Sequence, residues 1–230
     1  ADLAYGDVNY LALDDNEKEM LSNVAAMKAD GTVSKIIVLI NSANTLQLDF
    51  LKDNIYNVDA CLWIGDVGIT GINAVADILA GNVNPSGSLV DTYCYDNMSS
   101  PAMANFTPVT YEGYTEELVP EKAKSYMVYQ EGIYVGYKYY ETRYEDTVMG
   151  TGNAGSYVYS DDVAFPFGYG LSYTDFEYSD MTGVYDAATD SYNFNVTVTN
   201  TGDTYSGKET VQIYAQSPYT EYDKENSVEK

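Results

Sequence analysis

The N-terminal part of the chain alternates between a helical pattern and short, continuous apolar runs. Over Asp14–Lys28, apolar residues recur at helical spacing among charged residues, and acidic residues occupy the first turn, where the helix dipole favours them. The run Ile36–Ile40 is apolar throughout and rich in β-branched residues, which is typical of a strand buried on both faces of a parallel sheet. A second helix is predicted over Leu46–Asn54.

The same alternation then repeats along the chain. Ala60–Ile64 is a second buried strand by its pattern, Gly65–Gly71 is a glycine-rich loop, and Ile72–Ala80 is the next predicted helix. A further strand is predicted over Ser88–Tyr95 after a turn. Strands that alternate with helices predict an α/β fold, a three-layer sandwich with a mostly parallel sheet and right-handed crossovers.

Beyond this region the periodicity changes twice. Asn97–Met127 loses its regular pattern among Pro, Ser and Thr residues, which predicts a long surface excursion that serves an interface or the mouth of a site. After Tyr173 the apolar residues follow period two, which predicts the beginning of an antiparallel β-sandwich on both sides of a turn near 200–207. The apolar positions of its two predicted strands are Phe194, Val196 and Val198, then Val211, Ile213 and Ala215.

The charge and the missing residue types exclude several kinds of function. The net charge is -24, with 35 acidic and 11 basic residues, which argues against nucleic acid, anionic membranes and phosphate-rich ligands and favours neutral polyols as partners. The chain has no histidine, so it cannot form a Ser-His-Asp or Cys-His catalytic pair or a zinc site that includes histidine. Cys61 and Cys94 are too few for a disulfide framework, although a single bridge between them stays open.

Three motifs, in this order and spacing, carry a resemblance to a known family. They are the turn Asn84–Leu89, the aromatic run Glu131–Tyr140 and the segment Phe165–Thr174, in which glycines and a proline alternate with aromatic residues. Together they resemble the C-terminal part of glycoside hydrolase family 3, which includes many β-glucosidases and β-xylosidases. The strands and the helix before Asn84 resemble the same family, and the segment beyond Thr174 resembles the start of the fibronectin-III-like domain that many members carry.

The resemblance implies a division into two domains and an activity. Residues 1–174 would be the α/β domain of the family, without its N-terminal edge, and residues 175–230 would be an incomplete, all-β segment of immunoglobulin or fibronectin-III type. The whole protein would be a retaining, exo-acting β-glycosidase without a cofactor or a metal, most readily a β-glucosidase, with β-xylosides as the alternative substrate.

The resemblance also implies that the catalytic carboxyl groups lie outside this chain. Retaining hydrolysis needs a nucleophile and an acid about 5 to 5.5 Å apart. In the family the nucleophile is an Asp of a (β/α)8 barrel, which would be a missing partner domain, and in many members the acid is a Glu in a loop of the α/β domain. Asp2 and Asp7 resemble residues just after that Glu, so no catalytic residue is assigned here, and the isolated chain is expected to be inactive.

A candidate active-site rim follows from the position of polar residues. Ligands of open parallel sheets gather beyond the carboxyl ends of the strands. The expected rim residues are Asp2, Asp7, Asn41, Ser42, Asn44 and Asp66. Packing against the absent barrel is the competing interpretation of these residues. The alternative functions are a non-catalytic carbohydrate-binding or scaffold module, favoured by 25 tyrosines whose rings can stack on sugars, and a flavodoxin-like binding protein.

Overall fold

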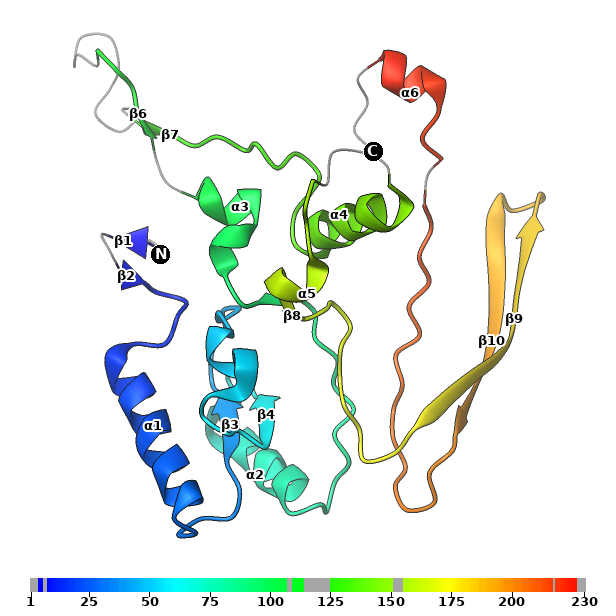
Figure 1. Cartoon of the computed structure of the whole chain (residues 1–230). Helices are drawn as coiled ribbons and strands as arrows, with labels where there is room; N and C mark the ends of the chain where they lie inside the picture. Colours follow the sequence, from blue (N-terminus) through cyan, green and yellow to red (C-terminus); the bar gives the residue numbers. More distant parts are fainter. Residues whose placement is uncertain are drawn as a thin grey trace. The chain divides into compact units, whose positions relative to one another are not determined.

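The computed structural model describes residues 4–5, 8–106, 109–113, 125–150, 155–216 and 218–226 of the chain (Figure 1). The chain divides into two compact units. The first unit comprises Ala1–Asp66 and Val90–Gly168, and the second comprises Val67–Leu89 and Tyr169–Lys230. Among the helices of the described residues, none has the length and apolar character needed to cross a membrane.

The first unit begins with a small strand pair and a well-capped helix. Strands β1 (Ala4–Tyr5) and β2 (Val8–Asn9) pair antiparallel, and helix α1 (Asp15–Ala29) follows. The Glu17 backbone N–H donates to the Asp14 carboxylate at 2.8 Å, and the Asp14 N–H donates to the Glu17 carboxylate at 2.9 Å. This capping box satisfies two N–H groups that the first turn leaves unpaired, and the helix predicted over Asp14–Lys28 is confirmed within one residue at each end.

The two apolar runs form the predicted strands and pair in parallel. In the two-stranded sheet of β3 (Ile37–Ile40) and β4 (Ala60–Trp63), Ile37 lies opposite Ala60 and Ile40 opposite Trp63. Ile36 and Ile40 are buried, whereas Ile37 is 48% exposed. Burial on both faces is therefore a wrong expectation for β3. Side chains alternate between the faces of a strand, and in this two-stranded sheet only the face that includes Ile40 is well covered.

The connection between β3 and β4 also differs from its prediction. In place of an α-helix over Leu46–Asn54, the structure has the short 3-10 element η1 (Asp49–Asn54). Lys52 and Asp53 leave helical geometry within it, and Asp53 has a φ of +58°. The apolar residues of this segment are nevertheless used, because Leu48 and Phe50 are buried.

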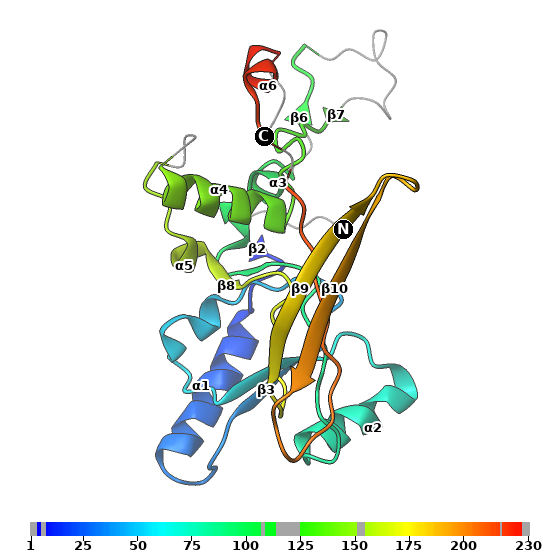
Figure 2. The same ribbon diagram turned by 90° about the vertical axis from the view of Figure 1, so that its right-hand side faces the viewer.

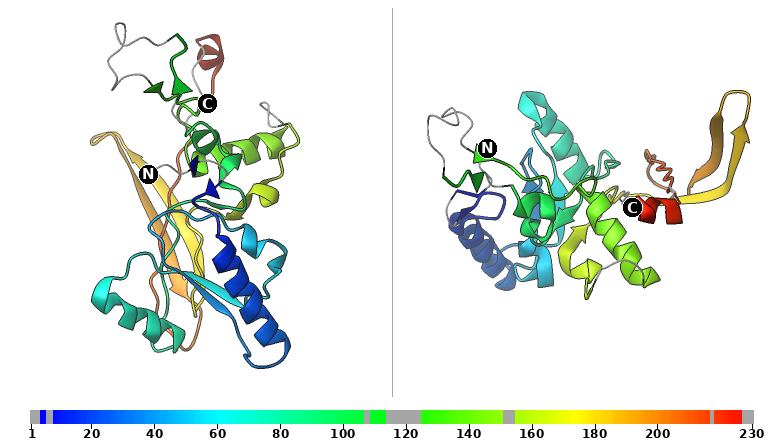
Figure 3. Two further views of the ribbon diagram at one scale, coloured as in Figure 1. Left: turned by 90° about the vertical axis from the view of Figure 1, so that its left-hand side faces the viewer. Right: turned by 90° about the horizontal axis from the view of Figure 1, so that it is seen from above.

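A cluster of aromatic residues forms the core of the rest of the first unit. The strand predicted over Ser88–Tyr95 is much shorter in the structure, where β5 comprises only Tyr93–Cys94. This strand pairs antiparallel with β8 (Val163–Phe165). Helix α4 (Tyr137–Met149) contacts α5 (Tyr159–Asp162), which leads into β8, and the two helices lie side by side in green and yellow-green in Figure 3. The buried cluster contains Cys94, Tyr140, Tyr157 and Val163, with Tyr139 and Tyr159 packed against it.

The predicted surface excursion contains short elements. They are η2 (Asn97–Ser99), α3 (Pro101–Ala104) and an antiparallel pair of β6 (Val109–Thr110) with β7 (Ser125–Tyr126). Asn97 anchors the start of this segment, because its side-chain amide donates to the Thr45 carbonyl at 3.2 Å. Residues 107–108 and 114–124 of the excursion lie outside the described residues.

The second unit contains helix α2 (Gly68–Leu79), a long hairpin and the short C-terminal helix α6 (Glu221–Glu225). Strands β9 (Phe176–Asp186) and β10 (Ser191–Asn200) pair antiparallel (Figure 2). The antiparallel character predicted for this region is confirmed, but the predicted partner of β10 is wrong. Residues 211–215 form no strand, and β10 pairs with the segment before it, which requires only a short turn.

Asn84 connects two of the three sequence motifs inside the second unit. Its side-chain oxygen accepts hydrogen bonds from the Tyr173 N–H at 2.7 Å and the Ser172 hydroxyl at 3.0 Å, and its amide donates to the Ser206 carbonyl at 3.1 Å. A Cβ on Gly170 would lie 2.5 Å from the Gly87 carbonyl oxygen, so only glycine permits this approach. The turn at Asn84 and the glycine-aromatic motif are therefore packed together and connected by hydrogen bonds. We call these two segments, Asn84–Leu89 and Phe165–Thr174, the joint.

Candidate functional site

Polar residues follow the carboxyl ends of β3 and β4, which meet at one edge of the sheet because the two strands are parallel. We call this region the carboxyl edge and define it as Asn41, Ser42, Asn44, Trp63 and Asp66. The Ser42 hydroxyl donates to the Asn44 carbonyl at 3.0 Å and accepts from the Asn44 N–H at 3.1 Å. Both hydrogen bonds lie within the loop after β3. Ser42, a predicted rim residue, therefore stabilises the conformation of that loop.

A hydrogen bond connects the loop after β3 to the end of β4. The indole Nε1–H of Trp63 donates to the Ser42 carbonyl at 2.9 Å, and the Ile64 N–H donates to the Ile40 carbonyl at 3.0 Å. Trp63 is 40% exposed, although its place in the apolar run Ala60–Ile64 predicts a buried strand residue. It is the single tryptophan of the chain and lies two residues before the glycine loop, and that position is the signal that could have identified it.

The other predicted rim residues have different outcomes. Asn41 and Asp66 are exposed and flank Ser42 and Gly65 at the carboxyl edge. Asp2 and Asp7 lie outside the described residues, so the structure does not test their position. The structure therefore brings Ser42 and Asn44 into contact, joins Trp63 to them, and leaves Asn41 and Asp66 as accessible polar side chains beside them.

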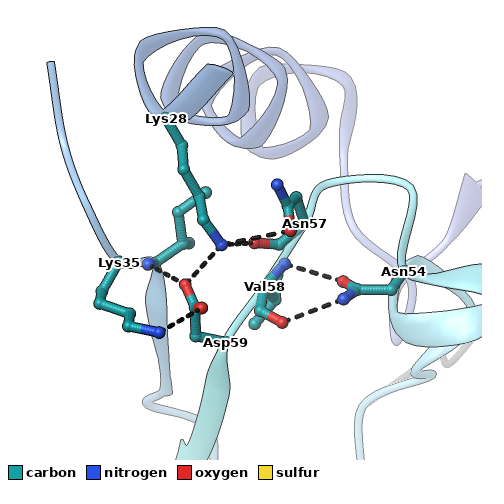
Figure 4. Close-up of polar contacts among 7 residues, drawn as sticks. Lys28, Lys35, Asn54, Asn57, Val58 and Asp59 are labelled. Carbon is teal, nitrogen blue, oxygen red and sulfur yellow. Dashed lines mark hydrogen bonds and ion pairs between the residues drawn. The ribbon is translucent and has the colours of Figure 1, made fainter. Parts of the chain in front are cut away.

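An ion-pair network occupies the opposite end of the same two strands (Figure 4). The Asp59 carboxylate contacts Lys28 Nζ at 2.7 Å and Lys35 Nζ at 3.1 Å, and it accepts from the Ile36 N–H at 2.7 Å. The hydrogen bond from Lys28, followed by that from Ile36, holds the pKa of Asp59 well below its usual range. Lys28 also donates to the Asn57 carbonyl at 2.8 Å. These contacts join α1 to the starts of β3 and β4.

The two cysteines are free thiols. Burial raises the pKa of Cys61 and of Cys94 to about 11, so both stay protonated at neutral pH. The open question of a bridge between them is thereby answered for this structure. Cys94 is buried and Cys61 is half-buried, and neither environment is that of a reactive nucleophile.

Neither of two hollows on the described surface is lined by residues of the carboxyl edge. One, of about 450 Å³, lies beside Arg143, Tyr157, Asp161 and Asp162 in the first unit. The other lies between the β9–β10 hairpin and the segment around Val211 and Ile213 in the second unit. No group of three or more Cys, Asp or Glu side chains arranged to hold a metal ion occurs in the described part of the chain.

Comparison with known families identifies this architecture. Residues 4–137 match the family model of the glycosyl hydrolase family 3 C-terminal domain. The chain belongs to glycosyl hydrolase family 3. The match contains the β3–β4 sheet, the carboxyl edge and the turn at Asn84, so the resemblance inferred from the motifs is confirmed.

The curated relatives are longer proteins with glycosidase names. A β-glucosidase of Ruminococcus albus is 32% identical over 206 residues, which are 90% of this chain and 17% of that protein. An exo-α-(1→6)-L-arabinopyranosidase of Bifidobacterium breve is 37% identical over 150 residues, which are 64% of this chain and 15% of that protein. This chain therefore spans less than a fifth of the length of either relative.

Solved structures of the family share the fold. A β-glucosidase from Paenibacillus barengoltzii matches with a TM-score of 0.62 and 30% identity, covering 85% of this chain and 18% of that one. β-Glucosidase 3B from Thermotoga neapolitana, solved in complex with α-D-glucose, matches with a TM-score of 0.59 and 31% identity, covering 84% and 22%. The α/β fold class predicted from the sequence is thereby confirmed.

Proposed function

We propose that this chain is the α/β part of a retaining, exo-acting β-glycosidase that hydrolyses β-glucosides or short β-linked oligosaccharides. The family match over residues 4–137 carries this proposal, because it covers the region that forms the carboxyl edge. The β-glucosidase names of relatives and of solved structures favour a glucoside as the substrate. An uncharged sugar also suits a chain of net charge -24.

In this proposal catalysis is shared between this chain and a (β/α)8 barrel of the same protein. The barrel supplies an Asp nucleophile, and a loop that precedes the residues of this chain supplies the Glu that protonates the leaving oxygen. The mechanism is double displacement with retention and needs no cofactor. The carboxyl edge, together with Asp2 and Asp7, forms one wall of the active site. The 230-residue chain alone is therefore inactive.

The decisive experiment compares the chain alone with the chain joined to its barrel. The joined protein should release the phenol from an aryl β-glucoside and give the β-anomer of glucose as the first product, as followed by NMR. The chain alone should give no rate above buffer. Hydrolysis by the isolated chain, after removal of contaminating enzymes, would contradict the shared active site.

The glycone specificity is open to a direct test. The name of one relative, an exo-α-(1→6)-L-arabinopyranosidase, refers to a sugar other than glucose. We expect the joined protein to have a higher kcat/KM for aryl β-glucoside than for aryl β-xyloside, because a site that binds the extra hydroxymethyl group gains contacts with it. A preference for the xyloside would replace glucoside by xyloside in the proposal.

The two-domain division is part of the same proposal. Residues 1–174 form the family domain, completed as a three-layer sandwich in the whole protein, and residues 175–230 begin a fibronectin-III-like domain. We expect a chain ending at Thr174 to keep slow amide exchange in β3 and β4, since their stabilising contacts lie within the first unit. Loss of that protection in the shortened chain would show that the two regions fold as one domain.

A further inference from the structure

The indole of Trp63 is held at two points at the carboxyl edge. Its Nε1–H donates to the Ser42 carbonyl at 2.9 Å, and its six-membered ring borders the space that a side chain at Gly65 would fill. A Cβ at Gly65 would come within 3.2 Å of Trp63 Cζ2, so the absence of a side chain there lets the ring take this position. The ring is therefore fixed, although 40% of Trp63 is exposed.

The surroundings of this ring are polar and suit an uncharged, hydroxylated ligand. Asn41 and Asn44 are exposed, carry side-chain amides and belong to the loop whose Ser42 carbonyl accepts from the indole. These groups can donate to and accept from hydroxyl groups, whereas the net charge of -24 disfavours anions. An aromatic face beside a few polar groups is the usual composition of a site for a small polar ligand with an apolar face.

We propose that Trp63 is a sugar-stacking residue, which places the less polar face of a pyranose ring against the exposed part of the indole. This inference rests on the proposed function and adds a binding residue to it. The C–H groups on one face of a pyranose are weakly positive, and the indole face is negative, so the two attract each other when water is displaced. Because the indole is already fixed, little conformational entropy is lost when the sugar binds.

The 230-residue chain itself provides the measurement. Trp63 is its single tryptophan, so fluorescence excited at the red edge of the indole band reports on this residue despite the 25 tyrosines. Titration with methyl β-D-glucoside should change the emission and reach saturation. Sorbitol, an open-chain polyol without a ring face, should cause no saturating change at the same concentrations. No saturating change with the glucoside, or an equal response to sorbitol, would overturn the proposal.

Two glycine variants separate a displaced ring from a strained backbone. Gly65→Ala adds a methyl group against the indole at a φ of +56°, and Gly31→Ala adds one at a φ of +85° where no atom lies within 4 Å. Both variants keep Trp63. We expect Gly65→Ala to weaken glucoside binding by about tenfold, a difference of about 1.4 kcal/mol, and Gly31→Ala to leave it unchanged. Equal affinities in the two variants would contradict a role for the position of the ring.

Calorimetry on Trp63→Phe and Tyr222→Ala completes the test. The phenylalanine variant keeps a smaller aromatic face but loses the bond to Ser42, so it should bind the glucoside more weakly than the wild type. Tyr222 is 69% exposed in α6, and its removal should have no effect. If the barrel-joined protein hydrolyses glucosides while Trp63→Phe leaves glucoside affinity unchanged, the stacking role is wrong and the proposed function stands.

Discussion

The β3–β4 pair and the β9–β10 hairpin are both two-stranded sheets, but they are held together differently. The parallel strands have four residues each, and their connection contains η1. Their ends are fixed by the Asp59 network and by the bond from Trp63 to Ser42. The hairpin strands have 11 and 10 residues, with the shared register unbroken apart from a bulge between Asn195 and Thr197. The hairpin is therefore stabilised by many backbone hydrogen bonds between long neighbouring strands, and less by the burial of its side chains.

Exposure shows what this difference means for stability. Ile40 of β3 is 6% exposed, whereas Val184 and Tyr192 of the hairpin are 62% and 66% exposed. Tyr192 instead contacts neighbours on its own face, with its ring centroid 5.1 Å from that of Tyr185 and 6.1 Å from that of Phe194. A cross-strand pair such as Tyr185 with Tyr192 contributes a few tenths of a kcal/mol to about 1 kcal/mol. The parallel pair should therefore be sensitive to single substitutions, and the hairpin should tolerate them.

The largest contrast is expected between Ile40→Ala and Val184→Ala. Removing three buried carbon atoms from Ile40 leaves a cavity and should lower the free energy of unfolding by about 3 kcal/mol. Val184 is largely exposed, and its truncation should cost less than about 0.5 kcal/mol. Urea denaturation followed by Trp63 fluorescence and by circular dichroism measures both. Equal losses would mean that the two sheets are stabilised in the same way.

The next effect tests the joint that supports the hairpin. Gly170→Ala places a methyl group 2.5 Å from the Gly87 carbonyl oxygen, which belongs to backbone that cannot easily move. We expect a loss of about 2 kcal/mol in the second unit, with faster amide exchange in β9 and β10 but not in β3 and β4. Gly87→Ala is the matched control, because a Cβ there meets no atom within 4 Å. Faster exchange in all four strands would show that the units are coupled.

The sequence predicts the buried elements of the fold better than the exposed hairpin. Helix α1 and strands β3 and β4 were predicted because their apolar residues are consecutive or helically spaced. Strand β9 was not predicted, because exposed strands do not require regular apolar alternation. The 3-10 geometry of η1 was missed since Leu48 and Phe50 can be buried from either kind of turn.

The candidate site was predicted only as far as topology determines it. The rule that parallel strands end at one edge predicted Ser42 and Asn44 as rim residues, but their mutual contact is local, because both follow β3 and are two residues apart. It could not show that Trp63 turns back to donate to Ser42, since that bond depends on Gly65 and on a contact across 21 residues. The Asp59 network was missed for the same reason, because Lys28 and Asp59 are 31 residues apart.

The next prediction concerns the pH dependence of the Tm when the Asp59 network beside β3 and β4 is removed. Asp59→Asn removes the charge that attracts Lys28 and Lys35 and should lower the Tm by a few degrees at neutral pH. The folded pKa of Asp59 lies below the value of about 3.9 in an unfolded chain, so its stabilisation is complete above about pH 5 and is lost as the pH falls through the folded pKa. The difference in Tm between wild type and variant should therefore shrink in acid.

Salt and a matched variant check the origin of that difference. High salt should reduce it, because Lys35 is 70% exposed and its attraction to Asp59 is screened. Asp190→Asn in the hairpin turn is the control, since Asp190 accepts from the Tyr185 hydroxyl at 2.7 Å and forms no ion pair with a lysine of the described residues. A Tm difference for Asp59→Asn that grows in acid would contradict the assigned direction of its pKa.

The smallest effect is expected for Gly183→Ala in the hairpin, compared with Gly65→Ala at the carboxyl edge. A Cβ at Gly183 would lie 2.8 Å from Phe194 Cε1, but the Phe194 ring is the far end of a side chain that is 44% exposed and can rotate away. Alanine also suits a strand better than glycine, so the net change should stay within about 0.5 kcal/mol. Gly65 has a φ of +56°, which an alanine adopts only with strain, and its substitution should cost about 1 kcal/mol or more. Thermal unfolding of both variants decides whether the hairpin adjusts as an exposed sheet should. A larger loss for Gly183→Ala would mean that the Phe194 ring is held as firmly as the indole of Trp63.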